Sequence, residues 1–133
     1  MTYTVESVRR DLRGIARKNA HVETLTRTRQ YLLSQIALAK EMGKDAADLE
    51  KRLASALQSL QRLLAETAES EARYIVCVCA LSPLHRTLIL EHYVHGVALW
   101  KAGEKVGYSE SQAKEHLRRA LKELIEMLNK GTG

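Results

Sequence analysis

The segment that most constrains the fold runs from Leu99 to Leu128, where a short helical pattern, a glycine turn and a long amphipathic pattern follow one another. Small or apolar residues at Leu99, Ala102 and Val106 suit the inner side of a short helix. Gly107 is free to adopt the positive φ that ends a helix tightly, and Ser109 is a favoured N-cap for the next one. The segment therefore predicts a helix-turn-helix, whose second helix has the size to enter the DNA major groove.

The predicted second helix has two chemically different sides. At 100° per residue, one side is apolar: Ala113, Leu117, Leu121, Leu124 and Leu128. The other side and its flanks carry the candidate DNA-binding residues, which are Glu110, Ser111, Gln112, Lys114, Glu115, Arg118, Arg119 and Lys122. Residues near the start of the helix are expected to lie deepest in the groove, and Arg118, Arg119 and Lys122 are better placed for phosphates. The alternative interpretation of this side is an ordinary solvated surface.

The rest of the chain favours an all-α fold. Among 133 residues there are one proline, seven glycines and no phenylalanine, and strong helix formers dominate. We expect a helical arm over residues 1–80, with helices at about 5–19, 22–42 and 45–80, and a helix-turn-helix domain over 81–130. Ser82 and Pro83 suit the start of that domain's first helix, Gly43 the end of the helix at 22–42, and Asp45 the cap of the helix after it.

The arm combines a basic helix with a leucine-rich pattern. Apolar residues in the first helix recur at spacings of three and four, and several arginines surround them. The sequence leaves open whether this helix binds DNA, folds back on the hairpin or docks on RNA polymerase. Further along, a heptad pattern favours either an antiparallel hairpin within the chain or a dimer through a coiled coil: Leu49, Leu53, Ala56, Leu60, Leu63 and Thr67.

Other classes of function find little support in the sequence. A net charge of +5 agrees with a nucleic-acid partner but is modest. We find no glycine-rich phosphate loop and no Cys/His set with metal spacing, and Cys77 and Cys79 are interpreted as small apolar fillers of a helix. We expect no enzyme, no cofactor and no metal. No apolar run approaches the roughly 20 residues that span a bilayer, and no signal-peptide core is present, so we expect a cytoplasmic protein without a membrane partner.

Several short motifs together resemble a known family. Tyr93-Val94-His95-Gly96, Trp100, Val106-Gly107-Tyr108-Ser109 and Leu117-Arg118-Arg119-Ala120-Leu121 resemble region 4 of bacterial sigma factors. They are most similar to the sigma-like ArpU/RinA-type late transcriptional regulators of phages and prophages, over about residues 81–128. The resemblance implies a recognition helix at Ser109–Leu121, a partner helix at Leu99–Val106, and base-reading positions at Glu110, Ser111, Lys114 and Glu115.

The leading hypothesis is therefore a sequence-specific, DNA-binding transcriptional regulator of phage or prophage type. Its expected partners are double-stranded DNA, RNA polymerase and a second copy of the chain bound through the N-terminal helices. The first alternative is a DNA-packaging protein resembling a small terminase subunit, which also joins a helix-turn-helix to a helical oligomerisation segment. The second is a protein-interaction module in which the same fold does not touch DNA.

Overall fold

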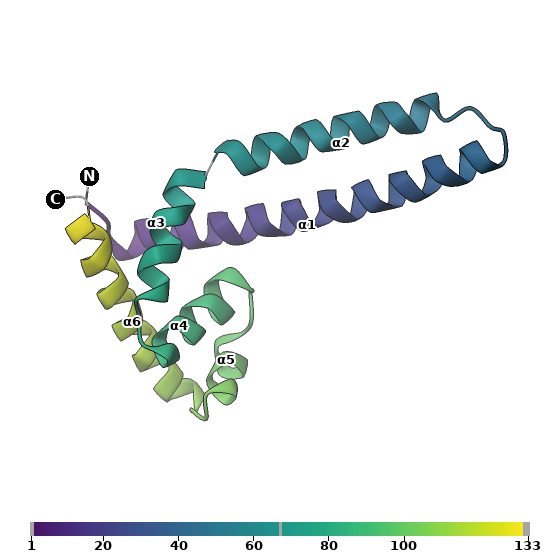
Figure 1. Cartoon of the computed structure of the whole chain (residues 1–133). Coiled ribbons are helices and arrows are strands. Elements are labelled where there is room, and N and C mark those ends of the chain that lie inside the picture. The colour runs from purple at the N-terminus through teal and green to yellow at the C-terminus, as the bar shows by residue number, and fades with distance from the viewer. Residues whose placement is uncertain (1, 67, 132–133) are drawn as a thin grey trace. The chain divides into compact units, whose positions relative to one another are not determined.

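The computed structural model describes residues 2–66 and 68–131, which form helices joined by short turns (Figure 1). In chain order the elements are α1 (Val5–Glu41), α2 (Ala47–Glu66), α3 (Ala68–Cys79), α4 (Pro83–Ile89), a π-helical segment η1 (Leu90–Val94), α5 (Leu99–Lys105) and α6 (Glu110–Gly131). The described ranges contain no strand, which confirms the all-α class. None of the helices in these ranges is long and apolar enough to cross a membrane.

The chain forms two compact units that share α1. One, the hairpin unit, comprises Lys18–Ala68; the other, the core unit, comprises Met1–Arg17 together with Glu69–Gly133. The units do not divide at residues 80/81, where we expected the boundary. Residues at both ends of the expected arm belong to the core unit, because Val8, Leu12, Tyr74 and Val78 are buried in its hydrophobic cluster.

Two of the predicted helix boundaries in the arm are wrong. The helices expected at 5–19 and 22–42 are one continuous helix of 37 residues. The residues between them, from Lys18 to His21, include neither glycine nor proline, so nothing interrupts the backbone hydrogen bonds there. Conversely, the single helix expected at 45–80 is divided into α2 and α3. The junction between these two, at position 67, lies outside the described residues.

The hairpin unit pairs the second part of α1 with α2, which runs in the opposite direction (Figure 1). Gly43, at φ +69°, ends α1 with the two hydrogen bonds of a Schellman motif: Lys44 N–H donates to Ala39 O (2.8 Å) and Gly43 N–H to Lys40 O (3.1 Å). Asp45 Oδ1 accepts from Ala47 N–H at 3.0 Å. The predicted helix stop and the predicted cap are thus confirmed.

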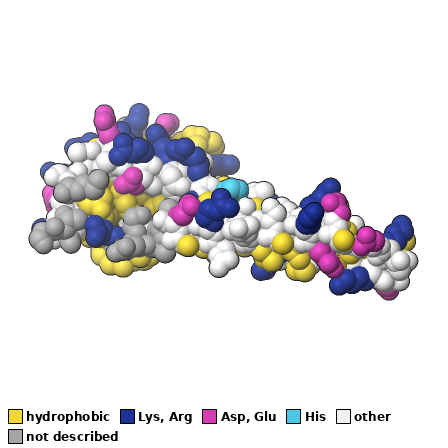
Figure 2. Space-filling view, turned by 90° about the horizontal axis from the view of Figure 1, so that it is seen from above, with side chains coloured by type: hydrophobic (Ala, Val, Ile, Leu, Met, Phe, Trp, Pro, Cys, Tyr) yellow, Lys and Arg dark blue, Asp and Glu magenta, His cyan; other side chains and the backbone are white. Residues whose placement is uncertain are grey.

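The hairpin unit buries few apolar side chains. Its buried hydrophobic residues among those described are Leu32, Ile36 and Ala46, and α2 has no buried residue in its described part. The residues of the predicted heptad that lie in α2 are half-buried, and Thr67 lies outside the described residues. In the space-filling view, hydrophobic side chains are visible on the surface of this unit among the charged ones (Figure 2). The unit therefore leaves a substantial part of its apolar surface in contact with solvent.

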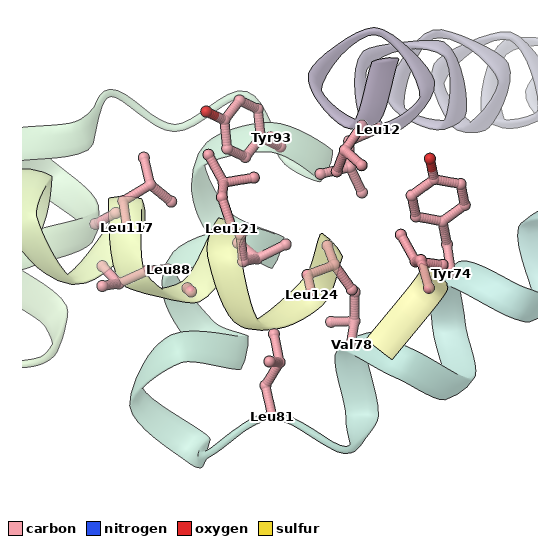
Figure 3. Packing of buried hydrophobic residues seen from close by; sticks show 14 of the residues in the cluster. Leu12, Tyr74, Val78, Leu81, Leu88, Tyr93, Leu117, Leu121 and Leu124 are labelled. Atoms are coloured by element: carbon pink, nitrogen blue, oxygen red, sulfur yellow. The ribbon is translucent and has the colours of Figure 1, made fainter. Parts of the chain in front are cut away.

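The core unit is organised around the apolar side of α6. Leu124 and Leu128 have no exposed surface, and Leu117 and Leu121 are nearly as buried. The residues that surround them come from α1, α3, α4 and η1, as Figure 3 shows for Leu12, Tyr74, Leu88 and Tyr93. The α6 stripe predicted from periodicity is therefore confirmed as core.

Polar contacts attach the N-terminal residues to this core. Tyr3 N–H donates to Asn129 Oδ1 at 2.8 Å, and Tyr74 Oη donates to Asp11 Oδ2 at 2.6 Å. Burial, together with the hydrogen bond to Asp11, raises the pKa of the Tyr74 phenol well above its ordinary value. These contacts connect α1, α3 and α6, which are far apart in sequence.

Two further predictions concern the start of α4 and the two cysteines of α3. The first is confirmed, and the second is wrong for one cysteine. Ser82 caps α4 through its hydroxyl, which accepts from His85 N–H at 3.4 Å, and Pro83 occupies the first turn, as expected. Cys77 is half-buried against the core, but Cys79 is exposed. The interpretation of both cysteines as packing residues is therefore wrong for Cys79, which lies on the outer side of α3.

Helices α5 and α6 approach each other closely at Gly103 of α5. A Cβ atom built there would lie 2.9 Å from Ala113 Cβ of α6 and 3.0 Å from the carbonyl oxygen of Tyr108. Neither neighbour is the end of a flexible side chain, so a larger residue would force the two helices apart. Glycine at 103 and alanine at 113 together set the distance at which α5 packs on α6.

We predict that Gly103→Ala lowers the free energy of unfolding by about 1–3 kcal/mol, because it overpacks this crossing. The matched control is Gly14→Ala, since a Cβ at Gly14 in α1 meets no atom within 4 Å. That control should stabilise the protein by about 0.5–1 kcal/mol through helix propensity. Urea unfolding followed by circular dichroism measures both, and an unchanged or raised midpoint for Gly103→Ala would contradict the predicted crossing.

Candidate nucleic-acid interface

The turn between α5 and α6 is built from two local hydrogen-bonding motifs. Gly107, at φ +78°, ends α5 in a Schellman motif, in which Tyr108 N–H donates to Gly103 O at 2.8 Å and Gly107 N–H to Glu104 O at 3.1 Å. Ser109 then begins α6: its Oγ accepts from Gln112 N–H at 3.3 Å, and Gln112 Oε1 accepts from Ser109 N–H at 3.0 Å. This reciprocal pair is a capping box, which fixes the direction in which α6 starts.

The eight candidate residues all lie on the exposed surface of α6. They are Glu110, Ser111, Gln112, Lys114, Glu115, Arg118, Arg119 and Lys122. Because Ala113, Leu117 and Ala120 are buried, the rotation of the helix about its axis is fixed by the core. The exposed surface is therefore presented in one orientation, starting from the N-terminal end of the helix.

Glu115 brings two of the candidate arginines together. Arg118 donates two hydrogen bonds to the Glu115 carboxylate, at 2.7 and 3.3 Å, and Arg119 Nε lies 3.4 Å from Glu115 Oε1. The hydrogen bond from Arg118 holds the pKa of Glu115 below its usual range, and the same bond raises the pKa of Arg118. In the free protein, one carboxylate thus partly neutralises the cationic part of this surface.

The remaining candidates differ in their availability. The Gln112 side chain is engaged in the cap, so its amide oxygen is not free to face a ligand while the cap is intact. Glu110, Ser111, Lys114 and Lys122 form no side-chain hydrogen bond or ion pair with any residue that the structure describes. These four side chains are the ones most readily offered to a partner.

A cluster of aromatic side chains, which residue spacing in the sequence did not predict, packs between α6, α4 and the turn before α6. His85 of α4 is buried, and its Nε2 lies 3.4 Å from Nδ1 of His116 in α6. The His116 ring in turn packs on Tyr108 of the turn, with centroids 4.9 Å apart. His85 Nδ1 lies 3.1 Å from Glu123 Oε1, but the two atoms lack hydrogen-bond geometry. The cluster links α4, the turn and α6, so His85 and His116 have a structural role at this interface.

Within the described residues, no group of three or more His, Cys, Asp or Glu side chains is arranged to hold a metal ion. Comparison of the chain with models of protein families, with curated proteins and with solved structures finds no match. The functional interpretation therefore rests on the geometry of the chain itself.

We predict that Ser109→Ala destabilises the protein by about 1 kcal/mol, because it removes the hydroxyl that caps α6. Ser111→Ala, two residues further along and without a side-chain partner among the described residues, is the control and should change stability by less than about 0.5 kcal/mol. Urea unfolding of the two variants checks this. Equal stabilities would show that the capping box contributes nothing to the position of α6.

Proposed function

We propose that this protein is a sequence-specific, DNA-binding transcriptional regulator of the phage or prophage type, in which α5 and α6 form a helix-turn-helix. The observation that carries the proposal is the α5–turn–α6 arrangement. A close helix crossing at Gly103, a Schellman turn and a capping box hold α6 in place. Its outer surface is polar from the first turn onward, begins with the acidic Glu110 and becomes mainly cationic from Lys114. That combination is what major-groove recognition requires of a helix. The sequence resemblance to sigma region 4 agrees with it.

The proposed roles follow from position along α6. Glu110, Ser111 and Lys114 lie in the first turns and would face base edges, where a carboxylate accepts from cytosine and lysine donates to guanine. Arg118, Arg119 and Lys122 would contact phosphates. Gln112 maintains the cap, and Glu115 orients Arg118. We therefore assign these two residues a positioning role and not a contact with bases.

A second copy of the chain is the proposed partner of the hairpin unit. Tyr31 and Leu38 are seven residues apart and share one side of α1, and Met42 follows directly after the end of that helix. The three side chains are 64%, 49% and 57% exposed. Residues 30–39 contain no charged side chain. In a dimer with two-fold symmetry, a surface patch of one copy packs against the same patch of the other copy. A charged patch would therefore bury like charges against each other, and an uncharged patch avoids this. We call these three residues the hairpin row.

Two other functions would use the same fold. A packaging protein would bind DNA without strong sequence preference as a larger oligomer, and a protein-interaction module would not bind DNA. RNA polymerase, implied by the sigma-like resemblance, stays a predicted partner. Selection from random duplex DNA distinguishes the regulator, the packaging protein and the protein-interaction module.

We predict that selection from random duplex DNA at about 150 mM salt, followed by sequencing, enriches a defined motif. A motif with two-fold symmetry would agree with a dimer. Binding without enrichment would contradict sequence-specific regulation and favour packaging, and no binding would favour a protein-docking role.

The variants of α6 should divide into two groups in this assay. Arg118→Ala with Arg119→Ala should weaken binding to all sequences and reduce the salt dependence, whereas Lys114→Ala or Ser111→Ala should change the preferred sequence. Arg27→Ala with Arg52→Ala removes the same charge from the hairpin unit, where both arginines are paired with acids, and is the control. If neither group differs from this control, the proposed orientation of α6 is wrong.

We further predict that the wild type sediments as a dimer and that Leu38→Glu sediments as a monomer, because the charge would be buried in the interface. Leu33→Glu is the control: Leu33 is also about half exposed but points away from the hairpin row. Sedimentation equilibrium measures both masses. A monomeric wild type, or dissociation by Leu33→Glu alone, would contradict the assignment of the hairpin row.

A further inference from the structure

A row of arginines lies along the first part of α1, outside the surface assigned to α6. Arg9, Arg13 and Arg17 follow one another at intervals of four residues, so they lie on one side of the helix. Each step advances about 6 Å along the helix axis. All three are exposed, and they belong to the core unit. We call these residues the arginine row.

The helix that carries the arginine row is firmly attached to the core. Val8 and Leu12 are almost completely buried, and Figure 3 shows Leu12 pointing from α1 into the cluster that contains Tyr93. Asp11 accepts the hydrogen bond from Tyr74, and Arg9 Nε donates to Tyr93 Oη at 3.1 Å. The backbone that presents Arg13 and Arg17 is thus preorganised, which reduces the entropy cost of binding a ligand there.

The arginine row borders an open pocket of about 350 Å³ between α1 and the end of η1. Its lining residues are Arg13, Ala16, Arg17, His92, Tyr93 and Gly96. The π-helical turn of η1 and the positive φ of Gly96 bring His92 and Tyr93 to this position. Such π-helical turns are frequent at functional sites. No Asp or Glu is among these lining residues, so the pocket combines two guanidinium groups and an imidazole without a compensating carboxylate.

The two guanidinium groups have no partner in the part of the chain that the structure describes. Arg13 and Arg17 form no ion pair or side-chain hydrogen bond with the residues that the structure describes. By contrast, Arg27, Arg52 and Arg118 each have an acidic partner. A guanidinium group matches a phosphate with two parallel N–H···O bonds, and a regular row of such groups suits a repeating anion better than a single one. The chemistry therefore favours a chain of phosphates.

We propose that Arg13 and Arg17, together with His92, form a second phosphate-binding site that holds the sugar–phosphate backbone of duplex DNA. The site is distinct from the exposed surface of α6 and reads no sequence. His92 Nδ1 lies 2.9 Å from Val97 O and donates to it, which fixes the imidazole ring at the pocket. The identity of the duplex rests on the proposed function, but the phosphate chemistry of the pocket does not.

The test compares Arg13→Gln/Arg17→Gln with Arg27→Gln/Arg52→Gln, which removes the same charge from the hairpin unit. Fluorescence anisotropy with a labelled duplex is measured between 50 and 200 mM salt. The slope of log K against log salt should fall by about 2 for the first variant, with about a tenfold loss of affinity at 100 mM salt, and by much less for the control. Arg13→Lys/Arg17→Lys should keep most of the slope because it keeps the charge. Circular dichroism confirms that each variant is folded.

The failure of this proposal is distinguishable from that of the proposed function. Equal slopes for the two glutamine variants would overturn the second site, whatever the α6 variants do. A reduced slope for Arg13→Gln/Arg17→Gln, combined with α6 variants that have no effect, would support the second site and overturn the role of α6. Enrichment of the same motif by this variant as by the wild type would support a site that reads no sequence, and a changed motif would contradict it.

Two competitors identify the source of the phosphate. Binding of inorganic pyrophosphate is followed by NMR through the ring resonances of His92. It should be weak, because pyrophosphate is too short to contact the whole arginine row. Tight pyrophosphate binding without a change in the DNA slope would overturn the backbone assignment in favour of a small phosphate ligand. Poly-glutamate should displace DNA less effectively than unlabelled duplex at equal charge. More effective displacement would overturn nucleic acid as the ligand and indicate an acidic protein.

Discussion

The buried side of α6 is the surface on which the core unit is assembled. Leu117, Leu121, Leu124 and Leu128 lie in one hydrophobic cluster with residues from every other helix of this unit, and each buried leucine is worth about 1.5–3 kcal/mol. Because the buried and exposed sides belong to the same helix, the packing that stabilises the unit also fixes the direction of the polar side chains. Stability and the geometry of the candidate interface are thus set by the same contacts.

The features that could be predicted from the sequence are local ones. Gly43, Gly107, Ser82 and Ser109 act through hydrogen bonds to residues at most five positions away, so their residue types are informative without knowledge of the fold. The alternation of apolar and polar residues in α6 was informative for the same reason. The break expected within α1 was wrong because it was inferred from a change of pattern where no residue forces a break. A helix does begin at Pro83, but the units do not divide there, because residues of α1 and α3 pack in the core unit.

The rest depends on contacts between distant parts of the chain. An apolar stripe containing Val8 and Leu12 fits many surfaces, and periodicity does not say which one it covers. The pairing of His85 with His116 joins residues 31 positions apart, and the pocket joins residues near 13 to residues near 93. Each of these sites is made of residues that are unremarkable in their own segments. Only the folded chain shows that they meet.

The carboxylate of Glu115 has a consequence for how long any complex through α6 would last. In the free protein it already occupies the guanidinium group of Arg118, so an incoming phosphate must replace one anion by another. Such an internal competitor lowers the net gain from a backbone contact while leaving contacts made by Lys114 and Ser111 untouched. A regulator built in this way would release arbitrary DNA quickly and remain only where the bases fit, so Glu115 would speed the search for a target.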